Sequence, residues 1–191
     1  ENFTIFSLKN SPIVGNAIQC LLYDEKHDKL WIGTKKGLSI LDCTTQDFET
    51  LNLPDDIKIN NIVDLKLAKD GGIWIVNNHD NIIHYNPETS HYRVYNSKTC
   101  KGLSDRYRSI MEGPKDIIYI GHTNDGLSLL DKTSGKIRNF RHSPDNPHSL
   151  PGNDVFCIQI DHYGNVWVGT DQGLAMFDPV AEQFIPFLHN P

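Results

Sequence analysis

The segment VWVGTDQGLAMFD, residues 166–178, decides the fold because variants of it occur four times along the chain. Each copy starts beside a Trp or Tyr, carries Gly-Leu or its counterpart six or seven residues later, and ends at Asp or Asn. The copies are LWIGTKKGLSILD at 30–42, IWIVNNHDNIIHYN at 73–86, IYIGHTNDGLSLLD at 118–131 and VWVGTDQGLAMFD at 166–178. Their aromatic residues lie 43, 45 and 48 residues apart, which indicates an array of similar units instead of one unrepeated domain.

Each repeat resolves into four short strands separated by turn residues. The second strand carries the aromatic residue and its β-branched neighbours, which suit a pleated, packed surface. The first strands lie at 18–23, 62–67, 107–111 and 155–160, and the third strands are LSIL, IIHY, LSLL and LAMF. The fourth strands contain Phe48 and residues 92–95, 137–140 and 184–187. Such four-stranded blades are apolar on both faces, so they must stack around an axis.

We therefore predict an all-β fold: a β-propeller segment of four consecutive four-stranded antiparallel blades plus one extra N-terminal outer strand. The predicted boundaries are 3–8 for the extra strand, 16–53 for blade one, 57–96 for blade two, 105–141 for blade three and 153–188 for blade four. The extra strand has no first three strands before it, and Phe187, His189 and Pro191 align with Phe140, His142 and Pro144 at the start of the preceding linker. We interpret residues 1–191 as a single propeller segment of a longer chain, and expect the isolated segment to self-associate through its exposed end blades.

Particular residues carry further structural predictions. The recurring aromatic residue is expected to be a buried packing residue in each blade: Trp31, Trp74, Tyr119 and Trp167. Gly37, Gly126 and Gly173 precede the third strands, and Asn81 stands at that position in blade two. Because Asn tolerates positive φ better than most residues, this pattern predicts a left-handed turn position. Pro186 cannot donate a ladder hydrogen bond, which predicts that the fourth strand lies at a sheet edge.

The four cysteines fall into two groups. Cys20 and Cys157 occupy the repeat position that Asp64 and Ser109 hold in the other blades, so we expect buried free thiols on the first strands. Cys43 and Cys100 lie in predicted loops. A disulfide between these two would require an oxidising compartment, and the sequence leaves it open.

Composition excludes several classes of protein. The chain has 38% hydrophobic and 22% charged residues and a net charge of −6, which is typical of a globular protein. The Lys/Arg residues form no cluster beyond Lys35-Lys36, so we predict that this segment binds no nucleic acid. Its apolar stretches are far shorter than a membrane helix requires. Any membrane attachment is therefore expected through other parts of the full-length chain.

No catalytic pattern stands out. The nine histidines show neither His-x-x-x-His spacing nor an EF-hand loop, and the chain lacks a Gly-x-Ser-x-Gly elbow, a Walker loop and Gly-x-Gly-x-x-Gly. We predict no catalytic residue, no metal and no cofactor in this segment.

Recognition is expected where the repeats differ from one another. In a propeller, the turns between second and third strands and the linkers between blades share one face, and loops on a fixed scaffold commonly carry recognition. This face gathers Lys35, Lys36, His79, Asp80, Arg106, His122, Asn124, Asp125, Arg141, Asp171 and Gln172. We predict ligand binding near the linker between blades two and three, by His79, Asp80, Arg106, Tyr107, His122 and Asn124. A merely solvated polar rim is the alternative.

Blade four carries the most specific resemblance. Its unit runs from LPGNDV at 150–155 through DHYGNVWVGT at 161–170 to Gly173-Leu174 and Phe177-Asp178, after the linker SPDNPHSL at 143–150. This unit resembles the two-component regulator propeller repeat, and the likeness extends over essentially the whole chain. Blade two departs from the pattern with Val76 and Asn81 at glycine positions, and blade three with Gly113 and Tyr119.

The chain is thus similar to the periplasmic sensor region of Bacteroides-type hybrid two-component histidine kinases. The resemblance implies a non-catalytic periplasmic segment of an inner-membrane protein that senses oligosaccharides and signals to transcription through a phosphorelay. The kinase parts would lie outside these residues. Two alternatives stay open, namely a lyase-like propeller enzyme and a plain protein-interaction scaffold. The sequence does not give the ligand, the oligomeric state or the total number of blades.

Overall fold

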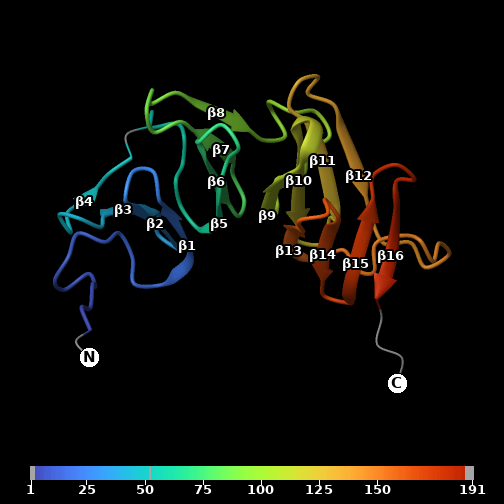
Figure 1. The fold of residues 1–191 in the computed structure, drawn as a ribbon, viewed down its shortest axis with the longest axis horizontal. Helices are drawn as coiled ribbons and strands as arrows, with labels where there is room; N and C mark the ends of the chain where they lie inside the picture. The colour runs from blue at the N-terminus through green and yellow to red at the C-terminus, as the bar shows by residue number, and fades with distance from the viewer. Residues whose placement is uncertain (1–2, 52, 188–191) are drawn as a thin grey trace. The chain divides into compact units, whose positions relative to one another are not determined.

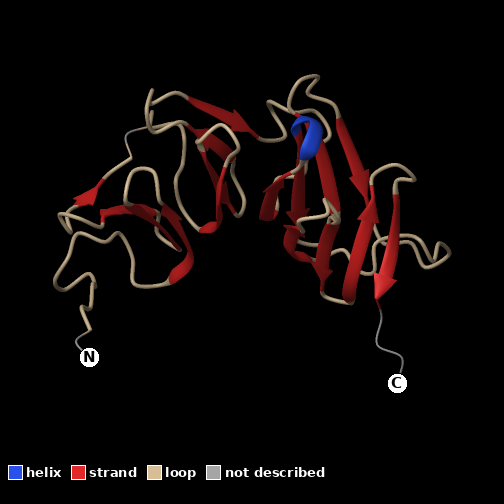
Figure 2. Ribbon diagram, viewed as in Figure 1, coloured by secondary structure: helices blue, strands red, loops and turns tan. Residues whose placement is uncertain are grey.

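The computed structural model describes residues 3–51 and 53–187, which form four antiparallel sheets of four strands each (Figures 1 and 2). The strands of blade one are β1 (Ile18–Asp24), β2 (Lys29–Thr34), β3 (Leu38–Asp42) and β4 (Phe48–Glu49). Those of blade two are β5 (Ile62–Leu67), β6 (Ile73–Asn77), β7 (Ile82–Tyr85) and β8 (Tyr92–Tyr95). The prediction of an all-β fold with four antiparallel four-stranded blades is confirmed.

Blades three and four repeat the same order. Blade three contains β9 (Tyr107–Glu112), β10 (Ile117–His122), β11 (Leu127–Asp131) and β12 (Ile137–Phe140). Blade four contains β13 (Val155–Ile160), β14 (Val166–Thr170), β15 (Gly173–Asp178) and β16 (Gln183–Phe187). Helical structure in the described ranges is limited to η1, a 3-10 turn at Pro114–Asp116, so no described helix is long and apolar enough to span a membrane (Figure 2).

The chain divides into two compact units, with the boundary between Tyr92 and Arg93, inside β8. In the first unit, β1 and β2 of blade one lie against β5 of blade two. In the second, β9 and β10 of blade three lie against β13 of blade four. The core of the second unit includes Leu129, Leu150, Val168 and Phe177, all buried. Each unit is thus held together by apolar residues from a pair of stacked blades.

Glycines at one repeat position allow this stacking. A Cβ added at Gly33 would lie 2.8 Å from Cγ2 of Ile62 in the neighbouring blade. One added at Gly121 would lie 2.6 Å from Cγ1 of Val155, again in the neighbouring blade. Each glycine therefore leaves room for an apolar residue at the start of the next blade's first strand. In blade two this position holds Val76.

The first two strands of every blade also share an irregularity. The register of this pair shifts by one residue where the start of the first strand meets the end of the second. The shift lies between Ile18 and Cys20 in blade one and between Val155 and Cys157 in blade four. Equivalent shifts occur between Ile62 and Asp64 and between Gly121 and His122. A β-bulge of this kind bends a strand and redirects its side chains. Here it directs the residue after the bulge toward the glycine position described above, as the contact of Cys20 with Gly33 illustrates.

The aromatic packing positions behave as predicted in three blades. Trp31, Trp74 and Tyr119 are at most 2% exposed, and burying a side chain of this size stabilises a fold by about 1.5–3 kcal/mol. In blade four, Trp167 is half-buried, and its indole N–H donates to Asp161 at 2.9 Å. The sheet order places β16, with Pro186, at an edge, which confirms the prediction for that proline.

The predicted N-terminal strand is wrong. Residues 3–7 are irregular and residues 8–10 form a turn. The Asn10 amide accepts from the Ser7 N–H at 2.7 Å and donates to the Ile5 carbonyl at 2.6 Å, while the Ser11 N–H donates to the Ser7 carbonyl. These local bonds use backbone groups that a strand would offer to a ladder. The Phe6 ring instead packs edge-on against Phe48.

Two smaller expectations also need correction. Gly37, Gly126 and Gly173 have positive φ, but Asn81 does not. The turn of blade two is nevertheless closed by the same backbone bonds as that of blade three. The Asn77 N–H donates to the Asn81 carbonyl as the His122 N–H does to Gly126, and the Asn78 N–H donates to the Asn61 carbonyl as the Thr123 N–H does to Arg106. Cys157 is exposed, because no described side chain covers that face of blade four. All four cysteines are free thiols, Cys43 and Cys100 included.

Residue 188, the last residue predicted for blade four, lies outside the described residues. So does residue 52 of blade one. That the four blades form one propeller segment of a longer chain stays a prediction.

Candidate functional site

Antiparallel pairing brings one set of loops to the same end of each blade. The start of the first strand, the turn between the second and third strands and the end of the fourth strand meet there. We call this the linker end of a blade. The predicted ligand-binding residues of blade three, Arg106, Tyr107, His122 and Asn124, all lie at its linker end in the second unit.

His79 and Asp80 occupy the corresponding turn of blade two, in the first unit. The His79 side chain is exposed, whereas Asp80 is partly buried and its Oδ1 lies 3.9 Å from Lys58 Nζ. His79 and Asp80 belong to the first unit, whereas the predicted residues of blade three belong to the second.

Blade three brings its four predicted residues close together. Tyr107 pairs with His122 across β9 and β10, and the centroids of their rings are 5.8 Å apart. The Thr123 N–H donates to the Arg106 carbonyl at 2.9 Å. Arg106 and Asn124 are exposed, and Asn124 adopts a left-handed φ of 60° in the turn. These two side chains are therefore available to a ligand.

Tyr107 does not have the exposed ring that its predicted role requires. The residue is fully buried, and its hydroxyl donates to Asp105 Oδ1 at 3.2 Å. Burial, followed by the Asp105 carboxylate, raises the pKa of the Tyr107 phenol. The ring packs inside the blade, so a ligand has no exposed face on which to stack.

His122 is also fully buried. It ends β10 at the repeat position that holds Thr34 in blade one and Thr170 in blade four. Both threonine hydroxyls donate to a glycine carbonyl in their own turn, Thr34 to Gly37 at 2.9 Å and Thr170 to Gly173 at 2.8 Å. The longer His122 side chain instead reaches the next strand, where its Nε2 lies 2.7 Å from Ser128 Oγ.

A chain of polar contacts continues from His122 to the outer strand. Ser128 Oγ donates to Asn139 Oδ1 at 2.6 Å, and Asn139 Nδ2 donates to the Gly102 carbonyl at 2.9 Å. A carbonyl can only accept, so the Asn139 amide turns its NH₂ toward Gly102 and its oxygen toward Ser128. The Ser128 proton then points to Asn139, and His122 must carry its own proton on Nε2.

The remaining ring nitrogen of His122 is poorly satisfied. Nδ1 is buried and has no hydrogen-bond partner of acceptable geometry among residues 3–51 and 53–187. Burial lowers the pKa of His122 to about 4, against the opposing effects of the Asp125 carboxylate and the Arg106 backbone. The imidazole is therefore neutral at physiological pH, and serves as a hydrogen-bond donor to Ser128.

A hollow of about 240 Å³ opens beside this chain. Its walls are the linker residues 102–104, the exposed edge of Asn139 on β12, Ser128 on β11, and the ion pair between Arg141 and Asp125. We call it the blade-three pocket. Asp125 and Arg141 belong to the face predicted from the sequence, but Ser128 and Asn139 do not. The sequence signal for these two was the presence of polar residues where blade four has Ala175 and Pro186.

A second, more open hollow of about 550 Å³ lies at the linker end of blade four. Its polar side chains already hold backbone groups in place. Asp154 Oδ1 accepts from the Asn124 N–H at 3.0 Å, and Asp171 Oδ1 accepts from the Asp154 N–H at 3.2 Å. The His142 ring contacts the Leu150 carbonyl at 2.8 Å. These contacts connect the turns of blades three and four, which is a structural role.

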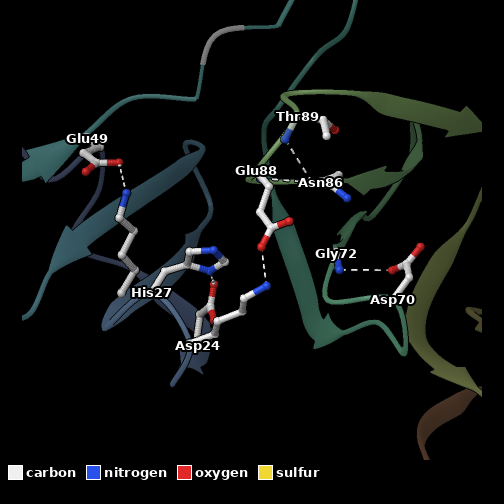
Figure 3. A network of polar contacts seen from close by, with 10 residues as sticks. Asp24, His27, Glu49, Asp70, Gly72, Asn86, Glu88 and Thr89 are labelled. Carbon is white, nitrogen blue, oxygen red and sulfur yellow. Dashed lines mark hydrogen bonds and ion pairs between the residues drawn. The ribbon is translucent and has the colours of Figure 1, made fainter.

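In the first unit, the end of the blades opposite the linker end carries a polar network (Figure 3). His27 Nδ1 lies 2.6 Å from the buried carboxylate of Asp24, and Lys26 of blade one pairs with Glu88 of blade two. Asp70 and Asn86 accept backbone N–H groups within their own turns, from Gly72 at 3.0 Å and Thr89 at 3.1 Å (Figure 3). Solvent screens the exposed Lys26–Glu88 pair, so it contributes little to stability. The network holds turns and bridges two blades, and within the described ranges no cluster of three or more His, Cys, Asp or Glu side chains could hold a metal.

The relationships to known proteins begin in the linker before blade four. Residues 149–172 match the family model of the two component regulator propeller. This match covers the end of the linker and the strands β13 and β14, and it confirms the resemblance found in the sequence. No curated protein sequence matches the chain.

Solved structures extend the likeness to almost the whole chain. One is described as the extracellular domain of the hybrid two component system BT3049 from B. thetaiotaomicron, with 29% identity, a TM-score of 0.83 and coverage of 95% of this chain and 25% of that one. Another is the extracellular domain of BT4673 from B. thetaiotaomicron, with 20% identity, a TM-score of 0.76 and coverage of 90% and 22%. The chain thus spans about a quarter of the length of these relatives.

A streptogramin B lyase structure is also similar, with a TM-score of 0.69, 16% identity and coverage of 94% of this chain and 57% of the lyase. At this identity the likeness shows the fold alone.

Proposed function

We propose that this chain is part of the extracytoplasmic sensor region of a membrane-bound hybrid two-component system. The observation that carries the proposal is the match over 95% of the chain, at 29% identity, to the extracellular domain of such a system. The family match at residues 149–172 supports it independently of that structure. In this proposal the segment is periplasmic, and it catalyses no reaction itself.

The ligand that we propose is an oligosaccharide bound at the linker end of blade three. Arg106 and Asn124 would contact it directly, since both side chains are exposed. Arg106 lies just before β9, and Asn124 lies in the turn after the adjacent strand β10. Tyr107 and His122 would act from beneath by holding the shape of this end.

Signalling requires more than binding. A ligand shifts a conformational equilibrium only if its affinity differs between the two arrangements. In the proposed mechanism, the occupied linker end changes how blades or protomers pack, and a histidine kinase outside these residues passes the change to transcription by phosphorelay. The exposed apolar residues on blade four, including Leu174, Ile185 and Phe187, would support contact with a neighbouring blade or a second copy.

The proposal is tested in the intact receptor with the double variant Arg106→Ala/Asn124→Ala. We expect weaker binding of the inducing oligosaccharide and reduced induction of the target gene. Lys136→Ala, an exposed residue in the turn at the opposite end of blade three, is the matched control and should leave both unchanged. Wild-type affinity in the folded double variant would remove this surface from the proposal. Product formation by the purified chain, from any glycan in a panel, would overturn the non-catalytic assignment.

A further inference from the structure

The blade-three pocket is built from polar groups of different kinds. Ser128 forms a buried part of its wall, with 2% of the residue exposed, while Asn139 and Arg141 are exposed at its edge. Asp125 Oδ1 pairs with Arg141, whose side chain is 61% exposed. The pocket therefore combines a hydroxyl, an amide, a cation and an anion around one small hollow.

These groups retain hydrogen-bonding capacity for a ligand. A serine hydroxyl has one proton and two acceptor sites. In Ser128 the proton goes to Asn139, and one acceptor site takes the Nε2 proton of His122. Counting partners in the described part of the chain, the second acceptor site remains, together with one Asn139 N–H and most of the Arg141 donors.

The charges select the chemistry of the ligand. Because Arg141 and Asp125 neutralise each other, the pocket has no net charge to attract an anionic or a cationic ligand. A ligand hydroxyl group can donate to Asp125 or to the remaining acceptor site of Ser128, and it can accept from Arg141 or Asn139. Several hydroxyl groups on one neutral molecule therefore match this arrangement better than a charged group does.

The volume limits the size of that molecule. Pockets for drug-sized ligands are typically about 300–1,000 Å³, whereas the blade-three pocket is about 240 Å³. It accommodates one ring and not an extended chain. Leu103, which is buried in the wall, provides an apolar contact for the carbon atoms of the ring.

Blade four shows that the fold does not need this polar chain. The counterparts of His122, Ser128 and Asn139 there are Thr170, Ala175 and Pro186. Ala175 and Pro186 have no polar side-chain atom, yet the sheet keeps the same strand order. A buried histidine with an unsatisfied nitrogen is unfavourable for stability, so its presence beside a pocket indicates a role other than folding.

We propose that the blade-three pocket binds the ring of a single neutral sugar or cyclitol through Arg141, Asp125, Ser128 and Asn139. His122 is a positioning residue, because its Nε2 proton fixes the direction of the Ser128 hydroxyl. This inference rests on the proposed function and names part of its ligand: the ring would be a free monosaccharide or the terminal residue of the sensed carbohydrate.

Direct binding provides the first test. The 191-residue chain is titrated, one probe at a time, with glucose, galactose, mannose and myo-inositol and followed by NMR. At least one probe should bind with a millimolar Kd and shift the amide resonances of residues 102–104, Ser128 and Asn139. If none of the four perturbs these resonances at millimolar concentration, the assignment of the pocket is wrong.

Variants locate the binding. Arg141→Gln should weaken binding at least 10-fold, an effect typical of losing a charged hydrogen-bond donor. Arg138→Gln is the matched control, since Arg138 lies on the same strand β12 but pairs with Glu182. Ser128→Ala should also weaken binding, whereas Ser39→Ala, at the same repeat position in blade one, should not. Unchanged affinity in folded Arg141→Gln and Ser128→Ala would overturn the proposal.

The charge argument has its own test. Asp125→Asn leaves Arg141 without its carboxylate partner, so the variant should bind glucuronate more tightly than the wild-type chain does. The expected change is about 10-fold or more in favour of the acidic sugar, the size of effect expected from a charged partner. No gain for glucuronate in the folded variant would contradict selection by the Arg141–Asp125 pair.

The positioning role of His122 is tested by NMR of its imidazole nitrogens. Long-range ¹H–¹⁵N spectra should show the Nε2-protonated tautomer, and the Nε2 signal should shift when a sugar binds to Ser128. A purely structural histidine would show no such shift, and that result would overturn the positioning role. If the sugar binds as predicted but a receptor carrying Arg141→Gln signals normally, sugar binding by the pocket is supported and its role in sensing is contradicted.

Discussion

Blades three and four share a unit, a strand order and a bulge near the end of the second strand, yet only blade three carries the polar chain from His122 to Asn139. In blade four the same positions are occupied by Thr170, Ala175 and Pro186. The repeated positions, such as the glycine near the end of the second strand, build the scaffold. The positions that differ carry the chemistry that a scaffold does not need.

Protonation of His122 gives the largest expected difference between the two blades. Its pKa falls from an ordinary 6.5 to about 4 because of burial, so the unfolded chain binds a proton that the folded chain excludes. The resulting loss of stability begins as the pH falls below about 6.5 and reaches about 3 kcal/mol near pH 4. His122→Thr, which installs the residue of blade four, should remove this part of the pH dependence.

The measurement is urea denaturation of the wild-type chain and His122→Thr at several pH values between about 7 and 4. The difference between the two proteins isolates His122 from the other titrating groups, including Asp105 and Asp125 beside it. Parallel pH profiles for the two proteins would contradict a buried neutral imidazole.

The glycine position gives the next largest effect. Gly121→Ala places a methyl group against Ser109 and 2.6 Å from Val155 Cγ1, both buried. We expect a loss of about 2 kcal/mol, within the range for overpacked cores. Gly169→Ala should cost less than about 1 kcal/mol, because its close neighbour is the exposed Cys157. Equal losses by thermal or urea denaturation would refute the difference between a covered and an uncovered face.

Exchanging the third-strand residues sharpens the same comparison. Ser128→Ala leaves His122 Nε2 and Asn139 Oδ1 without their shared partner, for an expected loss of about 1 kcal/mol. Ala175→Ser puts a hydroxyl into the buried position of blade four, where Pro186 offers no side-chain partner, and should cost a similar amount. Stability measured by urea denaturation should fall in both variants, and an increase in either would contradict the assigned network.

The smallest effect is expected at the surface. Arg138 of blade three pairs with Glu182 of blade four, and their side chains are 35% and 45% exposed. Exposed ion pairs contribute little, so Arg138→Gln should change the free energy of unfolding by less than about 0.5 kcal/mol. A loss larger than 1 kcal/mol in urea would mean that this pair holds the two blades together far more strongly than solvent screening permits.

Much of the fold was predictable because its signals are local. The alternation of apolar residues along each strand and the turn residues between strands act over a few residues, so they predicted four antiparallel sheets in the observed order. The prediction of an N-terminal strand was wrong for a reason that is also local. The side chain of Asn10 bonds the backbone on both sides of its own turn, a local alternative that the apolar pattern of Phe3, Ile5 and Leu8 concealed.

The candidate site was predictable only in part. Exposed residues in turns, Arg106 and Asn124, were correctly placed at the linker end because loop position follows from strand order. Tyr107 was expected to face a ligand and is buried, since the side of a strand on which a residue lies depends on the bulge near it. Ser128 and Asn139 were missed because each looks like an ordinary strand residue until its neighbour across the sheet is known.

The spacing of the aromatic residues and the punctuation of the turns were enough to specify four blades, because hairpins form between segments that are adjacent in the chain. The order of strands within each blade follows from the same adjacency. Which faces are covered, and which polar groups meet, depended on contacts between separate strands. Cys20 and Cys157 hold the same repeat position, yet a neighbouring blade half-covers Cys20, and burial raises the pKa of its thiol to about 12 while Cys157 is exposed. His122, Ser128 and Asn139 become one chain only when three strands pair, because a hydrogen bond depends on distances across the sheet that no single strand contains.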